Sequence, residues 1–93
     1  MTTVTLNETL RIPERITFRR VRDEMALLNL ETGVYFGLDE IGARIWELLA
    51  EHRSLQAVAQ RMAEEYDVAP AQLQEDLLRL TGELLAKGLI EVG

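Results

Sequence analysis

Residues 25–49 read MALLNLETGVYFGLDEIGARIWELL, and the hydrophobic period of this stretch changes midway. Two short apolar runs, 25–30 and 34–38, are separated by three residues that end in Gly33, which can adopt the positive φ of a tight hairpin loop. In the second run two sets of residues alternate, as on a strand with two distinct faces: Val34, Phe36 and Leu38 against Tyr35 and Gly37. We therefore expect the two runs to pair as an antiparallel hairpin.

After Leu38 the spacing of apolar residues becomes that of a helix. Asp39 is a good N-cap, and it precedes an apolar stripe formed by Ile41, Ile45, Leu48 and Leu49. Trp46 lies beside this stripe, and we expect it in the core between the helix and the sheet. The helix is expected to end near Arg53.

On either side of this stretch, the sequence predicts two strands before the hairpin and two further helices after the first helix. Residues 16–22 mix β-branched and aromatic residues with arginines, which favours a half-exposed strand, and residues 4–10 predict a further short strand. Ser54 can cap a second helix, residues 67–69 form a short link, and Pro70 begins a third helix that runs to about Lys87, before Gly88. The apolar tail 89–92 is expected to pack back on the sheet or a helix end.

These elements predict one α+β domain over residues 1–93, a three-stranded antiparallel sheet followed by three helices. This order is the outline of a winged helix-turn-helix whose hairpin has moved to the N-terminal side. Such a fold suggests DNA, but the third helix carries Glu75, Asp76 and Glu83 against Arg79 and Lys87, and the chain as a whole has a net charge of −6. We therefore expect no nucleic-acid partner.

The arginines of the first strand region form the only basic cluster of the sequence. We interpret Arg15, Arg19, Arg20 and Arg22 as a solvated strand face whose charge is offset by Asp23 and Glu24.

Composition argues against catalysis. The chain has no cysteine, one histidine (His52) and no glycine-rich phosphate loop, so we expect no catalytic residues, no metal site and no cofactor. The sequence shows neither a signal peptide nor an apolar run long enough to span a membrane, so we expect a cytoplasmic protein without a membrane partner. A binding protein remains the best hypothesis.

The third helix has an unusually wide apolar face. Leu73, Leu77, Leu80 and Leu84 form one stripe, and a second stripe about 100° away is formed by Leu78, Thr81 and Leu85. Either both stripes belong to the core, or one stays partly open as the wall of a groove.

Four segments together resemble the PqqD family. They are residues 27–46, LLNLETGVYFGLDEIGARIW; residues 63–68, AEEYDV; Asp76-Leu77; and residues 84–90, LLAKGLI. Where the family often has Asn, this chain has Asp39, which caps a helix equally well. The resemblance covers nearly the whole chain from about Arg15 onward.

The resemblance implies a domain that recognises the leader of a ribosomally made, post-translationally modified peptide. In this family the leader adds as a strand beside the third strand and against the third helix, and the domain presents it to a leader peptidase, a cyclase or another modifying enzyme. Carried over to this chain, the implied peptide-binding residues are Val34, Tyr35, Phe36, Gly37, Leu38, Leu73, Asp76, Leu77, Arg79, Leu80, Leu84 and Lys87.

Several functions remain open at this point. Within the family, the sequence favours a leader-binding B1 protein of lasso peptide biosynthesis over the PqqD protein of the pyrroloquinoline quinone pathway. Outside the family, the alternatives are a winged-helix DNA-binding regulator and an inert structural subunit.

Overall fold

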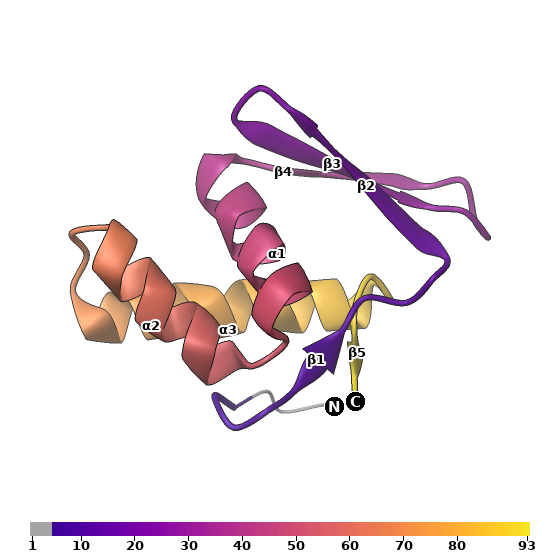
Figure 1. Cartoon of the computed structure of the whole chain (residues 1–93). Coiled ribbons are helices and arrows are strands. Elements are labelled where there is room, and N and C mark those ends of the chain that lie inside the picture. The colour runs from indigo at the N-terminus through magenta and orange to yellow at the C-terminus, as the bar shows by residue number, and fades with distance from the viewer. Residues whose placement is uncertain (1–4) are drawn as a thin grey trace.

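The computed structural model describes residues 5–93 and has the predicted order of elements (Figure 1). A three-stranded antiparallel sheet precedes three helices, so the α+β class is confirmed. The elements in chain order are β1 (Leu10–Arg11), β2 (Ile16–Val21), β3 (Glu24–Asn29), β4 (Tyr35–Leu38), α1 (Glu40–His52), α2 (Leu55–Glu65), α3 (Pro70–Ala86) and β5 (Glu91–Val92).

The main sheet has the strand order β2-β3-β4, so both β2 and β4 are edge strands. The β2–β3 turn places Arg22 at a positive φ of 59°, and the β3–β4 loop places Gly33 at 74°. The hairpin predicted around Gly33 is confirmed, although β4 begins one residue later than predicted and Val34 stays outside it with 61% of its surface exposed.

Local signals set the helix ends as predicted. The Asp39 carboxylate accepts a hydrogen bond from the Gly42 amide at 2.8 Å, and the Ser54 hydroxyl accepts one from the Ala57 amide at 3.3 Å. Pro70 is the first residue of α3, and Gly88 follows its end at a φ of 71°. β4 therefore passes into α1 through Asp39 alone.

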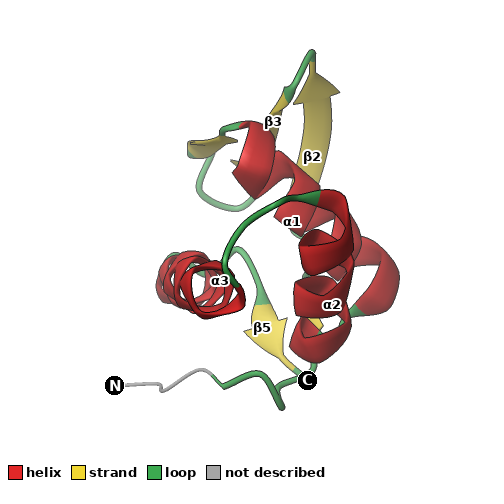
Figure 2. Ribbon diagram, turned by 90° about the vertical axis from the view of Figure 1, so that its left-hand side faces the viewer, coloured by secondary structure: helices red, strands yellow, loops and turns green. Residues whose placement is uncertain are grey.

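Helix α1 lies between the sheet and the other two helices. Figure 2 shows the sheet above α1, with α3 seen nearly end-on at one side and α2 at the other. Trp46 is fully buried, and the Phe18 ring on β2 meets its indole edge-on at 5.5 Å between centroids. The predicted core position of Trp46 is confirmed. Within residues 5–93, no helix is long and apolar enough to cross a membrane.

The two chain ends pair with each other, which corrects two predictions. The bounds of the strand expected over residues 4–10 are wrong. Residue 4 lies outside the described residues, and in residues 5–11 the strand comprises only Leu10 and Arg11. Its partner is β5, so the C-terminal tail pairs with the N-terminal segment rather than simply packing on the sheet or a helix end. Leu10, Leu89 and Ile90 are all buried, and this shared burial brings the two backbones together.

Two of the four arginines in the β2 region pair with acidic residues other than Asp23 and Glu24. Asp23 and Glu24 lie at the hairpin turn; instead Arg15 pairs with Glu91 at 3.1 Å and Arg20 with Glu47 of α1 at 3.0 Å. Phe18 and Arg20 share the face of β2 that looks toward α1, which explains why Arg20 reaches that helix.

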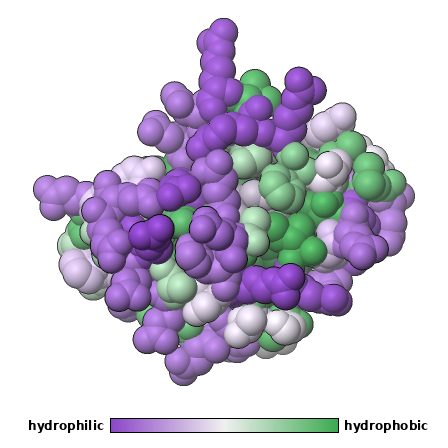
Figure 3. Space-filling model, in the orientation of Figure 1, coloured by the Kyte–Doolittle hydropathy of each residue, from purple (hydrophilic) through white to green (hydrophobic). Residues whose placement is uncertain are grey.

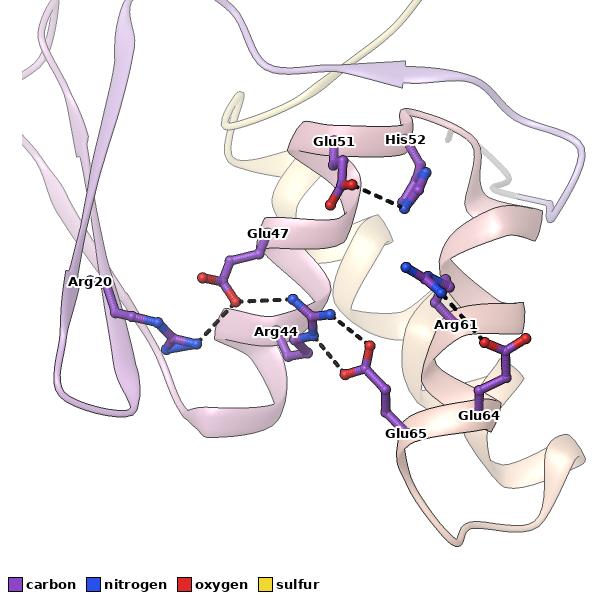
Figure 4. Close-up of polar contacts among 8 residues, drawn as sticks. All are labelled: Arg20, Arg44, Glu47, Glu51, His52, Arg61, Glu64 and Glu65. Atoms are coloured by element: carbon purple, nitrogen blue, oxygen red, sulfur yellow. Dashed lines mark hydrogen bonds and ion pairs between the residues drawn. The ribbon is translucent and has the colours of Figure 1, made fainter.

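A chain of ion pairs links the sheet to α1 and α2 (Figure 4). Glu47 accepts from Arg20 and lies 3.5 Å from Arg44, and Arg44 holds Glu65 at the end of α2 through two hydrogen bonds of 2.7 and 2.6 Å. The paired geometry of guanidinium and carboxylate fixes the spacing of α1 and α2 at this point.

These pairs predict how stability depends on pH. The hydrogen bonds from Arg44 lower the pKa of Glu65, and those from Arg11 and Arg15 lower the pKa of Glu91. A carboxylate with a lowered folded-state pKa stabilises the fold above its unfolded pKa of about 4.3, and this contribution is lost as the pH falls through the folded value. We expect a constant melting temperature from neutral pH to about pH 5 and a decline below it.

Glu65→Gln tests this dependence by thermal melts across the same pH range. The variant should melt lower at neutral pH and show a smaller decline in acid. Glu64→Gln is the matched control, because the Glu64 side chain is 60% exposed and its carboxylate lies 3.6 Å from Arg61 on the same helix. An unchanged acid dependence in Glu65→Gln would contradict the role given to this pair.

Candidate functional site: a groove along the open edge of β4

The outer edge of β4 presents unpaired backbone groups. The backbone N–H of Asn29 donates to the backbone carbonyl of Val34 at 3.0 Å, so these residues form a hydrogen-bonded pair at the loop end of the β3–β4 ladder. Because hydrogen-bonded and non-hydrogen-bonded pairs alternate in an antiparallel ladder, Phe36 and Leu38 bond to β3. The N–H and C=O groups of Tyr35 and Gly37 therefore point to the open edge.

A cavity of about 410 Å³ lies beside this edge, between β4, the first turns of α1 and the middle of α3. Its apolar lining comes from all three elements, and charged side chains stand among them. The lining residues are Phe36, Gly37, Leu38, Asp39, Ile41, Gly42, Ile45, Asp76, Arg79, Leu80 and Glu83.

A second cavity of about 370 Å³ continues along β4 toward the hairpin loop. Phe36 lines both cavities, and the ammonium group of Lys87 lies 5.3 Å from the centre of its ring, within the range of a cation–π contact. The other lining residues are Asn29, Thr32, Val34, Tyr35 and Leu89. The open edge of β4 is thus flanked by a hollow at each end, and we call the two together the β4 groove.

The structure brings nine of the predicted site residues to this groove and leaves three in the core. Leu73, Leu77 and Leu84 have 5%, 0% and 0% of their surface exposed, and none lines either cavity of the β4 groove. Leu80 is rotated by about 60° from Leu77 around the helix, which turns it out of the core and into the groove. The nine residues that line the groove are Val34, Tyr35, Phe36, Gly37, Leu38, Asp76, Arg79, Leu80 and Lys87.

The second apolar stripe of α3 does not form a wall of the β4 groove. Thr81 is fully buried, and its hydroxyl donates to the Leu77 carbonyl at 2.7 Å. Leu78 and Leu85 are half-buried, and neither lines either cavity of the groove. Leu78 lies about 160° around the helix from Leu80, on the opposite flank of α3.

Sequence reasoning missed the contribution of α1. Ile41 was expected in the apolar stripe of this helix, yet it is 42% exposed and lines the larger cavity together with Asp39, Gly42 and Ile45. The signal was its place two residues after the cap, in the first helical turn, where a side chain can still lie over the end of the preceding strand. Glu83 was missed as well, although it lies one and two turns from the predicted Arg79 and Asp76.

The other side of the molecule carries a separate apolar hollow. In the view of Figure 1, α3 lies behind α1, so Figure 3 shows the face away from the β4 groove. A hydrophobic patch lies there between the hairpin and α1, over a cavity of about 300 Å³ that Ile12, Ile16, Phe18 and Leu49 help to line. This hollow belongs to the β2 side of the sheet and shares no lining residue with the β4 groove.

The arrangement in the β4 groove suits an extended peptide. Unpaired strand groups can bind a peptide backbone, and the adjoining cavities can receive alternate side chains. Among residues 5–93, no three His, Asp or Glu side chains lie close enough together to hold a metal ion.

Comparisons with known proteins point to the same kind of ligand. Residues 24–90 match the family described as coenzyme PQQ synthesis protein D (PqqD). The chain is 35% identical over 83 residues to a PqqA binding protein of Xanthomonas oryzae pv. oryzae (strain PXO99A), covering 89% of this chain and 88% of that protein.

Two solved structures share the fold. TbiB1 in complex with the TbiA(beta) leader peptide superposes with a TM-score of 0.83 at 36% identity, covering 87% of this chain and 94% of that one. A lasso peptide synthetase B1 complexed with its leader peptide gives a TM-score of 0.80 at 26% identity, covering 89% and 98%.

Proposed function

Because the chain belongs to the PqqD family, we propose that it binds the leader segment of a ribosomally synthesised precursor peptide. The observation that carries this function is the open edge of β4, where Tyr35 and Gly37 present unpaired backbone groups between two hollows. Two similar structures hold a leader peptide, which supports the same ligand here.

Binding proceeds by strand addition. The leader lies antiparallel to β4, its backbone pairs with Tyr35 and Gly37, and its alternate side chains face the groove. An apolar leader side chain enters the larger cavity against Phe36, Ile41 and Leu80. Backbone pairing tolerates many sequences, so selectivity comes from these pockets and from charges at the rim.

The protein acts as a carrier rather than as an enzyme. It holds the leader while a separate leader peptidase, cyclase or other modifying enzyme acts on the rest of the precursor, and this takes place in the cytoplasm. The sheet and helices form a winged helix-turn-helix in this proposal, with the wing hairpin placed before the helices.

The pathway is that of a lasso peptide, with a PqqA-like precursor as the second candidate. The solved structure named as a lasso peptide synthetase B1 supports the first pathway, and the PqqA binding protein of Xanthomonas supports the second. DNA is a weaker candidate. The exposed charged residues of α3 are Glu75, Arg79 and Glu83, so this helix would meet the DNA phosphates with more negative than positive charge.

Titration of labelled precursor segments tests leader binding. We expect the leader half of a lasso precursor encoded near this chain to bind with a Kd in the micromolar range or tighter, and the core half to bind at least roughly tenfold more weakly. A PqqA peptide run in parallel separates the two pathways. Equal weak binding of both halves of both precursors would contradict leader recognition.

A further inference from the structure

The two ends of the β4 groove carry opposite charge. The larger cavity, at the Leu38 end of β4, has three carboxylates in its lining (Asp39, Asp76 and Glu83) and one guanidinium, Arg79. The cavity at the Tyr35 end has a single charged lining residue, Lys87. Going along the edge of β4, a bound peptide passes from a region of excess negative charge to a positive one.

The one cation of the acidic end does not cancel the carboxylates around it. Arg79 lies 3.4 Å from Asp76 and is 67% exposed, so its head group is free to turn toward water. Glu83 makes no ion pair with any residue in the described part of the chain. The Asp39 carboxylate makes no ion pair within the described residues either; it caps α1, where its Oδ1 atom accepts a hydrogen bond from the Gly42 amide at 2.8 Å.

At the other end, Lys87 is held in the groove. It is the C-cap of α3, and its ammonium group lies over the Phe36 ring at 5.3 Å, directly beside the open strand edge. A cation held over an aromatic ring keeps part of its hydrogen-bonding capacity free for an incoming carboxylate.

We infer that the groove selects its leader by charge order: a basic side chain, then an apolar anchor, then an acidic side chain, read from the leader's N-terminus. This inference rests on the proposed leader binding. β4 runs from Tyr35 to Leu38, so an antiparallel leader begins at the acidic end and finishes beside Lys87. Groove-facing side chains are two residues apart, about 7 Å along the strand, which places the three groups at alternate positions.

Three synthetic peptides with identical neutral flanks test the charge order. Their centres read Lys-Thr-Leu-Thr-Glu, Glu-Thr-Leu-Thr-Lys and Gln-Thr-Leu-Thr-Gln, and their Kd values are measured by fluorescence anisotropy at low and high salt. The Lys-first peptide is expected to bind roughly tenfold more tightly than the Glu-first peptide. In the Lys-first peptide both charged side chains meet opposite charges at the ends of the groove, whereas in the Glu-first peptide both meet like charges. The difference should shrink with added salt, whereas binding of the neutral peptide should not change.

Charge-swapped protein supplies the reciprocal measurement. The double variant D76K/K87E should prefer the Glu-first peptide, while the control Glu75→Lys, which changes an exposed α3 residue outside the groove lining, should keep the wild-type order. Equal affinity of wild-type protein for both charged peptides, or an unchanged preference in the double variant, would overturn the charge order alone if the neutral peptide still binds. Failure of all three peptides to bind would overturn strand addition to β4 as well.

Discussion

Replacing Gly37 with proline is expected to weaken leader binding by roughly ten- to hundredfold while the domain stays folded. Proline has no amide hydrogen, and the Gly37 amide is one of the two donors on the open edge of β4. Proline is tolerated on an edge strand when the lost donor faces outward, so the ladder between β3 and β4 should survive. The leader would lose one backbone hydrogen bond and meet the proline ring where its own backbone has to approach.

Gly37→Ala is the matched control for this variant. A Cβ at this position would meet no atom within 4 Å, and the amide donor is kept, so leader affinity should change little. Isothermal titration with the leader peptide and a thermal melt of each variant separate binding from folding. A folded Gly37→Pro protein that binds leader as well as Gly37→Ala would contradict strand addition at this edge.

Leu80→Asp is expected to abolish measurable leader binding, a loss of roughly a hundredfold or more. Leu80 is half-buried and lines the larger cavity, where a carboxylate would stand among Phe36, Ile41 and three existing acidic groups. An apolar leader side chain in this cavity would remove water from the new carboxylate without offering it a partner, which costs several kcal/mol. Because about 1.4 kcal/mol corresponds to a tenfold change in Kd, this cost accounts for the expected loss of affinity.

Leu78→Asp and Leu77→Asp separate this effect from a loss of stability. Leu78 is half-buried like Leu80 but lies on the opposite flank of α3, so its variant should lose similar stability and still bind leader. Leu77 is fully buried, and its variant should unfold. Weak binding by both Leu78→Asp and Leu80→Asp would mean that helix stability, rather than the cavity, governs affinity.

Most of the fold is predictable because its signals are local. Asp39, Ser54 and Pro70 each mark a helix start through groups within a few residues, and Gly33 marks the hairpin loop in the same way. The β1–β5 pairing has no such signal, because it joins segments 80 residues apart, as the Arg11–Glu91 contact illustrates. The two segments meet only in the folded protein, where Leu10 and Ile90 are buried in one core and Arg11 and Arg15 pair with Glu91.

The site could be predicted on β4 but not fully on α3 and α1. A helical wheel shows two apolar stripes on α3, yet it does not tell which one packs inward. Thr81 can be buried because its hydroxyl donates a hydrogen bond to the Leu77 carbonyl within the helix. The side of α3 that faces the core is therefore centred between the two stripes, and Leu80 lies at its margin, toward the groove. Ile41 was not predicted as a site residue because its spacing from Ile45 and Leu48 assigned it to the core stripe of α1. Its place in the first turn of the helix instead puts its side chain in the lining of the larger cavity, next to the end of β4.

The direct passage of β4 into α1 through Asp39 has a consequence for the rates of binding. The receiving edge is held in place by the helix that follows it, so it need not form or move when a leader arrives. Association should then occur at similar speed for leaders of similar charge, limited by how often a flexible peptide meets the edge while extended. Differences in affinity among such leaders should appear in how long each one stays bound, as is usual for related complexes.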